Sequence, residues 1–165
     1  MLDAVFPERI GRVALAIAVC VGCASGGGGR GSARAEAGAA RASCEDAPDI
    51  AARADAARAA AREGRLEEAL RLAEDVLRSC ATQPVAVAAL GQALVDLGRF
   101  DEAIARLTAI LQAGPGLAYA YYWRGKAYGA RQQTARMVDD LEAFLKLLPN
   151  APEAPAVQQL LSALR

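Results

Sequence analysis

A short segment rich in aromatic residues holds the side chains best suited to recognising another molecule. Five of the eight aromatic residues of the chain fall between Tyr119 and Tyr128. Residues three apart lie on one side of a helix, so Tyr119 and Tyr122 would present neighbouring rings. A tyrosine combines a large apolar body with a hydroxyl that bonds a partner, and such side chains often anchor bound peptides or helices. The segment from Tyr119 to Tyr128 is therefore a candidate binding surface.

The residue types that usually perform catalysis are missing. The chain has no histidine, which removes the commonest general base and the commonest transition-metal ligand. The glycine run 26–29 is followed by Arg30 and has no strand–helix setting, so it indicates a linker rather than a phosphate-binding loop. We therefore expect no catalytic residue, no cofactor and no metal site.

The composition favours closely packed helices. Hydrophobic residues make up 54% of the 165 residues, and aromatic residues only 5%. Much of the hydrophobic fraction is alanine, which favours helices over strands. The 19 basic and 19 acidic residues cancel, so no basic excess is available to follow a phosphate backbone. Nucleic-acid binding is not expected.

The elements that must position the tyrosines repeat every 34 residues. The matching pairs are Gly64 and Gly98, Ala69 and Ala103, and Pro115 and Pro149. A fixed period of this length indicates stacked helical hairpins. The apolar spacing predicts helix pairs at 49–62 and 66–79, at 84–97 and 100–113, and at 118–131 and 134–148.

Glycines explain how each hairpin turns and packs. Gly64 and Gly98 stand where a helix must end and turn, and glycine tolerates the left-handed conformation there. Gly91 and Gly125 lie within helices, where glycine costs about 1 kcal/mol relative to alanine. We interpret that cost as the consequence of close approach by the second helix of the same hairpin, with Ala103 opposite.

The C-terminal residues predict a capping helix at about 154–164. Pro152 and Pro155 mark a helix start. The predicted apolar stripe consists of Val157, Leu160, Leu161 and Leu164, and the polar residues Gln158, Gln159 and Ser162 fall largely off it. A helical array needs an end with one polar face. The alternative is that this stripe recruits a helix from another chain.

The repeat resembles the tetratricopeptide repeat, a family of helix–turn–helix units, over the frames 50–83, 84–117 and 118–151. The second frame carries most of the family's positions: Leu90, Gly91, Leu94, Gly98, Ala103, Leu107 and Pro115. The third frame departs from the family at Met137 and at Gln132, where the turn glycine is expected. The resemblance implies an all-α solenoid of about three repeats followed by a capping helix at 152–165.

The resemblance also implies a concave groove lined by the first helix of each repeat. The residues it assigns to partner binding are Arg58, Arg62, Gln92, Asp96, Tyr119, Tyr122 and Lys126. It assigns Tyr121 and Tyr128 to the core, and it allows Trp123 to pack against the preceding repeat. The alternative for Tyr119 and Tyr122 is that they cover the end of a short solenoid. The carboxylate clamp of some family members is not reproduced, since Ala54 and Gln92 occupy its positions.

Two cysteines lie at ends of helices that an antiparallel hairpin would bring together. Cys44 precedes the first predicted helix, and Cys80 ends the second. A disulfide between them is sterically plausible, and an exported protein permits it. Closing this loop would stabilise the fold by about 3–4 kcal/mol in the chain-entropy model. The alternative is a pair of free thiols.

The N-terminal residues predict export and a lipid anchor. Arg9 and Arg12 precede an apolar run at 13–21, which suits the hydrophobic region of a signal peptide. The run ends at Gly22 and Cys23, which resembles the lipobox of bacterial lipoproteins and implies a lipid on Cys23. Alternatives are a secretory signal without lipid, giving a soluble periplasmic protein, or a cytosolic protein whose start is apolar by chance.

These interpretations divide the chain into a signal peptide at 1–22, a flexible tether at 23–46 and a repeat domain at 47–165. We expect a non-catalytic protein–protein interaction scaffold of the bacterial envelope, anchored to a membrane and facing the periplasm. Its partner would be a protein or peptide held in the concave groove. The alternative is a small ligand-binding or enzymatic accessory that uses the tyrosine-lined groove.

Overall fold

The computed structural model describes residues 47–164, which contain seven α-helices and no strand. The helices are α2 (Pro48–Arg62), α3 (Leu66–Ser79), α4 (Pro84–Asp96), α5 (Phe100–Ala113), α6 (Ala118–Ala130), α7 (Thr134–Leu147) and α8 (Ala154–Ala163). Each begins and ends within one residue of its predicted bounds. The predicted leader, the anchor at Cys23, the tether and Cys44 lie outside the described residues.

The three hairpins turn in the same way. Gly64 and Gly98 adopt positive φ angles of 76° and 74°, which confirms their predicted role. Gln132 takes the same conformation at φ 59°, although it carries a side chain. In all three turns a backbone N–H donates a hydrogen bond to the carbonyl five residues before it, in the last turn of the helix. Arg65 donates to the Ala60 carbonyl at 2.9 Å, Arg99 to Leu94 at 2.8 Å and Gln133 to Tyr128 at 2.9 Å.

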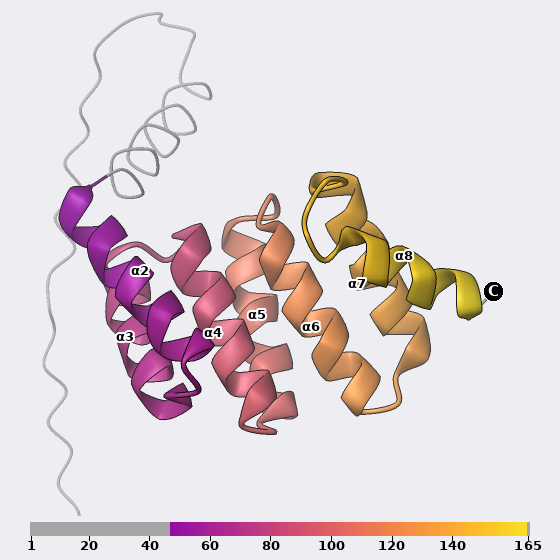
Figure 1. Ribbon diagram of the computed structural model, residues 1–165, viewed down its shortest axis with the longest axis horizontal. Coiled ribbons are helices and arrows are strands. Elements are labelled where there is room, and N and C mark those ends of the chain that lie inside the picture. The colour runs from indigo at the N-terminus through magenta and orange to yellow at the C-terminus, as the bar shows by residue number, and fades with distance from the viewer. Residues whose placement is uncertain (1–46, 165) are drawn as a thin grey trace, which may run out of the picture.

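The hairpins stack side by side into a two-layered array. The first helices of the repeats, α2, α4 and α6, contact one another in sequence, while α3 and α5 each pack against the first helix of the next repeat. Figure 1 shows the helices following one another along the long axis, with α8 beside α7 at the C-terminal end. This arrangement confirms the predicted all-α solenoid.

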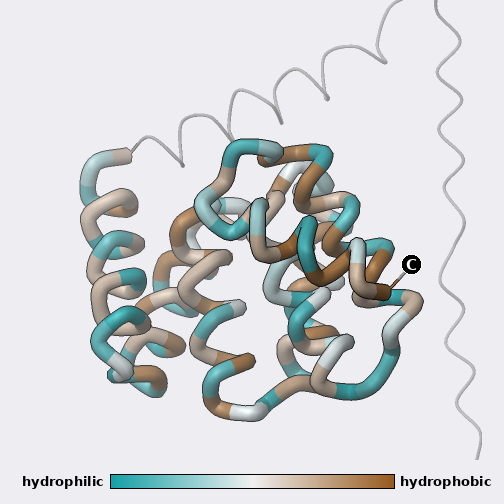
Figure 2. The backbone as a smooth tube through the Cα atoms, turned by 45° about the vertical axis from the view of Figure 1, so that its right-hand side comes forward, coloured by the Kyte–Doolittle hydropathy of each residue, from teal (hydrophilic) through white to brown (hydrophobic). Residues whose placement is uncertain are grey.

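The core falls into two clusters of buried side chains. The larger cluster runs from α2 to α6 and is built mostly of alanines, with Leu90, Leu94 and Leu107 as its largest fully buried aliphatic residues. The smaller cluster joins α6, α7 and α8 around Phe144 and Leu141. The tube in Figure 2 alternates between hydrophobic and hydrophilic bands along the helices, as expected where one side of each helix is buried.

Close approach explains Gly91 and Gly125, but only Gly125 as predicted. A Cβ atom on Gly125 would lie 3.3 Å from Asp140 and Leu141, which belong to the second helix of the same hairpin. A Cβ atom on Gly91 would instead lie 2.6 Å from the Cβ of Trp123 in the next repeat. The assignment of Ala103 as the residue opposite Gly91 is therefore wrong. Trp123 does pack against the preceding repeat.

The predicted apolar stripe of α8 is only half buried. Val157 and Leu161 are 5% exposed and join the smaller cluster, whereas Leu160 and Leu164 are 43% and 45% exposed. The four residues therefore do not share one buried face.

Cys80 is 2% exposed and disulfide-bonded. Because Cys44 lies outside the described residues, the Cys44–Cys80 pairing stays a prediction.

Candidate functional site

A concave cavity lies where α2, α4 and α6 come together. Its volume is about 270 Å³. The residues that line it are Arg58, Arg62, Pro84, Val85, Ala88, Ala89, Gln92, Tyr119, Trp123 and Glu153. Three helices and the start of α8 thus contribute to one surface, which we call the concave cavity.

The structure brings four of the seven predicted binding residues into this cavity. Arg58 and Arg62 come from the last two turns of α2, Gln92 from the middle of α4 and Tyr119 from the first turn of α6. They do not all occupy equivalent positions of the repeat, because the cavity runs obliquely from the last two turns of α2 to the first turn of α6. Their role in binding stays a prediction.

The other three predicted residues adjoin the cavity without lining it. The Lys126 ammonium lies 4.5 Å from the centre of the Trp123 ring and 5.7 Å from that of Tyr122, which is cation–π geometry. Burial raises the pKa of the Tyr122 hydroxyl, and the charges of Glu153 and Asp96 raise it further. Asp96 and Lys126 are exposed.

Glu153 is a lining residue that the sequence analysis did not identify. The Tyr119 hydroxyl donates a hydrogen bond of 3.0 Å to its carboxylate. Burial raises the pKa of Tyr119, and this bond raises it further, while the nearby Arg62 lowers it. The signal was present in the sequence, since Glu153 follows Tyr119 by one full period of 34 residues.

The two groove tyrosines also stabilise the fold. Tyr119 and Tyr122 are half-buried, and their ring centres lie 5.7 and 5.1 Å from that of Phe144. Tyr122 also makes an edge contact with Trp123 at 5.0 Å. The two readings of these tyrosines, as groove residues and as a cover over the smaller cluster, are therefore compatible.

The assignment of Tyr128 to the core is wrong. Its ring is half-buried but joins neither core cluster. It lies between the guanidinium carbons of Arg124 and Arg136, at 5.8 and 5.6 Å from the ring centre. Its position near the C-terminal end of α6 puts it among charged side chains. Tyr121 is half-buried and packs against both clusters.

The positive charge in the concave cavity is only partly neutralised. Arg58 pairs with Asp55 on its own helix at 2.7 Å, and both side chains are exposed. Among residues 47–164, Arg62 pairs with no carboxylate. It therefore offers a guanidinium that can bond a carboxylate of a bound molecule in two places.

A buried ion pair lies behind the groove. Two nitrogens of Arg124 on α6 donate to the two carboxylate oxygens of Asp140 on α7, at 2.8 and 2.7 Å. A third donates to the Thr108 hydroxyl on α5 at 3.0 Å. The bond to Asp140 raises the pKa of Arg124. The sequence analysis missed this network, because a lone Arg and a lone Asp 16 residues apart carry no pattern.

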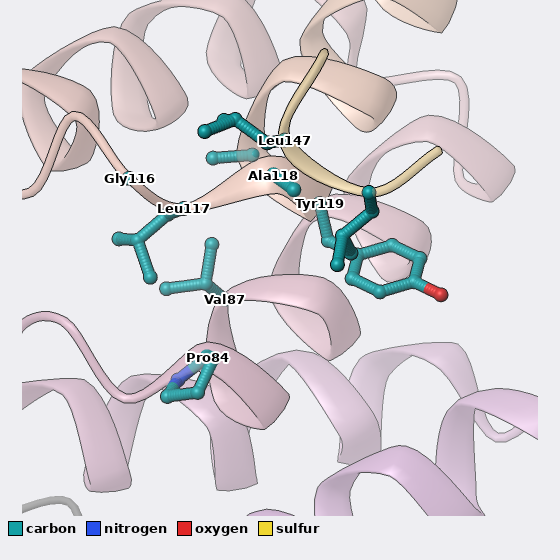
Figure 3. A pocket seen from close by; sticks show the side chains of 9 residues that line it. Pro84, Val87, Gly116, Leu117, Ala118, Tyr119 and Leu147 are labelled. Atoms are coloured by element: carbon teal, nitrogen blue, oxygen red, sulfur yellow. The ribbon is translucent and has the colours of Figure 1, made fainter. Parts of the chain in front are cut away.

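A second cavity, of about 310 Å³, opens at the edge of the array between the N-terminal ends of α4 and α6. Val87, Leu117 and Leu147 surround it, and the Tyr119 ring lies at its side with the hydroxyl pointing away (Figure 3). Its lining is almost entirely aliphatic and includes no titratable side chain except Tyr119. It offers no group for acid–base or nucleophilic chemistry.

Neither a cluster of metal-ligating side chains nor a membrane-spanning helix is found among the described residues. Between residues 47 and 164 no group of three or more His, Cys, Asp or Glu side chains is placed to hold a metal ion. Over the same residues no helix has the length and apolar character needed to span a bilayer. The concave cavity presents aromatic rings, the guanidinium groups of Arg58 and Arg62, and the carboxylate of Glu153.

The fold defines the protein as a stacked helical-hairpin array, and the comparisons specify its repeat. Residues 60–128 match the sequence model of the tetratricopeptide repeat family. This match and the helix pattern together confirm the predicted tetratricopeptide repeats. No curated protein matches the sequence significantly.

Two solved structures have the same fold. The first is the first TPR of Spaghetti (RPAP3) bound to the HSP90 peptide SRMEEVD, with a TM-score of 0.60 and 22% identity over 72% of this chain and 94% of that one. The second is the NMR structure of the first TPR domain of human RPAP3, with a TM-score of 0.57 and 21% identity over 69% of this chain and 93% of that one.

Proposed function

We propose that this protein is a non-catalytic scaffold that holds a segment of a partner protein in the concave cavity. The carrying observation is the cavity itself, where side chains from three successive repeats meet on one surface. Tyrosine, tryptophan and arginine are the residue types that contribute most binding energy at protein interfaces, and all three line it. The similar RPAP3 structure holds a peptide, which supports the same class of ligand here.

The absence of a catalytic constellation among the described residues supports binding over chemistry. A small ligand-binding or enzymatic accessory would need convergent polar groups in a deep pocket. Here the groups are spread along an open surface, and the cavity at the edge is aliphatic. We therefore favour a macromolecular partner.

Site-specific photocrosslinking in intact cells tests the proposal. A photoreactive amino acid at Gln92, which lines the cavity, should capture one discrete partner. The same amino acid at Ala109, exposed on α5 in the other helix layer, is the matched control and should capture nothing. Adding Ala88→Arg, which puts a long cation into the cavity, should abolish the Gln92 product. Equal capture from both positions, or from neither, contradicts the proposal.

We further propose that the scaffold is exported and anchored to a membrane through a lipid on Cys23, with the repeat domain facing the periplasm. The support is the apolar run at 13–21 that ends at Gly22 and Cys23. A bacterial lipoprotein of this kind would present the groove near a membrane surface, with residues 24–46 between the lipid and the repeat domain.

Fractionation after Cys23→Ala tests the anchor. The variant should move to the soluble fraction or stop maturing, because it lacks the thiol that would carry the lipid. Cys44→Ala is the control and should stay with the membrane. If Cys23→Ala still partitions with membranes after an alkaline wash, lipid attachment is wrong. Recovery of the wild-type protein in the soluble fraction would instead favour a soluble periplasmic protein.

A further inference from the structure

Helix α8 stands in the register of a fourth repeat. Frames of 34 residues that start at 50, 84 and 118 continue with one that starts at 152, and α8 (Ala154–Ala163) occupies the place of its first helix. The hydrogen bond from Tyr119 to Glu153 joins equivalent positions of the third and fourth frames. Helix α8 also contacts α7, although less extensively than α4 contacts α3 or α6 contacts α5.

Burial follows the same register. Ala86, Ala120 and Ala154 are equivalent, and all three are buried. Ala93, Ala127 and Leu161 are likewise equivalent and buried. In the first repeat the corresponding residues, Ala52 and Ala59, are exposed, because no described helix precedes α2. These positions therefore face the preceding repeat, and α8 uses them as α4 and α6 do.

The remaining sides of α8 differ in polarity. Gln158 and Gln159 occupy the positions of Leu90 and Gly91, which are buried within the second repeat. In α8 these positions are polar and exposed, which suits contact with water. Leu160 and Leu164, by contrast, are large and apolar yet 43% and 45% exposed. The exposure of Leu160 and Leu164, beside glutamines that suit contact with water, has to be explained.

The register supplies that reason. Leu160 is equivalent to Arg58, Gln92 and Lys126, and Leu164 to Arg62, Asp96 and Ala130. Two members of the first set and one of the second line the concave cavity. We infer that α8 forms a fourth wall of the groove and that Leu160 and Leu164 make its apolar end. The predicted capping helix is then also part of the binding surface.

The packing of α6 against α8 is consistent with a groove that widens at this end. The backbones of α6 and α8 make fewer close contacts than those of α4 and α6. Tyr119 reaches from α6 to Glu153, and Tyr122 packs on the cluster that Val157 and Leu161 join. Aromatic side chains thus fill the space that the helix backbones leave.

The occupant is a peptide segment of a partner with an acidic residue at one end and large apolar side chains at the other. The acidic residue would meet Arg62 on α2, the unpaired guanidinium of the cavity, and the apolar side chains would cover Leu160 and Leu164 on α8. Helices that pack directly lie about 8–10 Å apart, so the three steps from α2 to α8, the last of them between helices that are less closely packed, span at least about 30 Å. An extended segment of about nine residues covers that distance. This inference rests on the proposed function.

Selection from a display library of random peptides longer than this span, with the full chain as bait, tests the inference. Wild-type protein should enrich peptides that combine an acidic residue with apolar residues. The double variant Leu160→Ser/Leu164→Ser should bind the best of these peptides at least tenfold more weakly. Selection with this double variant as the bait should enrich peptides with acidic residues but not peptides with apolar residues. Arg62→Glu should do the reverse.

The matched control is Leu147→Ser/Leu148→Ser. These leucines are 40% and 38% exposed but line the edge cavity rather than the groove. This variant loses a similar amount of exposed apolar surface but none from the groove. Its affinity for the selected peptide should therefore stay within twofold of the wild type. Thermal unfolding of both double variants verifies that they are folded.

The outcomes separate the two proposals. Peptides that bind wild type, fail to bind Ala88→Arg and bind Leu160→Ser/Leu164→Ser unchanged would overturn the role of α8 but leave the groove in place. An equal loss of affinity in both double variants would also overturn it. If no peptide is enriched by wild type over Ala88→Arg, both the groove function and its extension onto α8 are overturned.

Discussion

The first and third hairpins have the same backbone but are held together in different ways. Helix α2 buries Ile50 and four alanines, and α3 adds two more alanines, a leucine and a valine. The third hairpin buries Phe144 and the ion pair of Arg124 with Asp140, and its rings lie over them. Small residues let helices approach closely but remove little apolar area from water. The first hairpin therefore gains more from a covalent link, and the third from its side chains.

The comparison also explains the polarity of the groove. In the first hairpin, where the core is built from alanine, the long side chains on the exposed side of α2 are all charged, such as Arg58 and Arg62. Where the core is built from large rings, some of the same rings reach the surface, as Tyr119 and Tyr122 do. The groove is therefore charged at α2 and aromatic at α6, because the two hairpins fill their cores with residues of different size.

The largest expected effect comes from breaking the buried ion pair of the third hairpin. Arg124→Ala leaves the Asp140 carboxylate, 7% exposed, without its bidentate partner. Removing one partner of such a pair costs about 3–5 kcal/mol of unfolding free energy. Urea unfolding monitored by circular dichroism measures the change.

The control for this variant is the exposed pair of the first hairpin. Arg53 and Asp49 are 46% and 72% exposed, so Arg53→Ala should cost less than about 1 kcal/mol. A loss in Arg124→Ala no larger than in Arg53→Ala would show that the third hairpin does not depend on its ion pair.

The next effect in size concerns the covalent support of the first hairpin. If Cys44 and Cys80 are paired, both thiols should resist labelling in the exported, non-reduced protein. Reduction should then lower the unfolding free energy by about 3–4 kcal/mol, with faster hydrogen exchange in α2 and α3. In Cys80→Ala, reduction should have no further effect. Ready labelling of both thiols would exclude the bridge.

A smaller effect separates the two helical glycines. Gly91→Ala gains about 1 kcal/mol of helix propensity but puts a Cβ atom 2.6 Å from the Cβ of Trp123. That atom is fixed to the backbone and cannot rotate away, so we expect a net loss of about 1–3 kcal/mol. Gly125→Ala, with its nearest neighbours at 3.3 Å, should lose less. The reverse order in thermal unfolding would contradict this account.

The smallest effect should stabilise the third hairpin. Gln132 has φ 59°, a left-handed conformation that costs a residue with a side chain about 1–2 kcal/mol. Glycine avoids that cost but loses about 0.5–1 kcal/mol in flexibility of the unfolded chain. We therefore expect Gln132→Gly to gain up to about 1 kcal/mol by urea unfolding. Gly98→Ala should lose a similar amount, and a loss in both would contradict the strain at Gln132.

The helices and their order could be predicted from the sequence because the signals are local or periodic. Pro84 favours a helix start through its own fixed φ angle, whatever packs around it. Gly64 and Gly98 end a helix because glycine adopts the positive φ angle that the turn requires. The spacing of 34 residues then places equivalent residues on equivalent surfaces. The resemblance to the tetratricopeptide repeat then assigned Arg58, Arg62, Gln92 and Tyr119 to one groove, and all four line the concave cavity.

The tertiary structure alone decided which side chains meet between repeats. Gly91 admits Trp123, Arg124 finds Asp140 and Thr108, and Tyr128 lies between two arginines. None of these contacts follows from spacing, since each depends on the distance and rotation of neighbouring hairpins. The sequence determined the repeat and the register of its helices. Packing between repeats determined which of these residues lie in the core, in the ion pair or in the groove. The reason is that the burial of a side chain depends on the neighbouring helices as well as on its own.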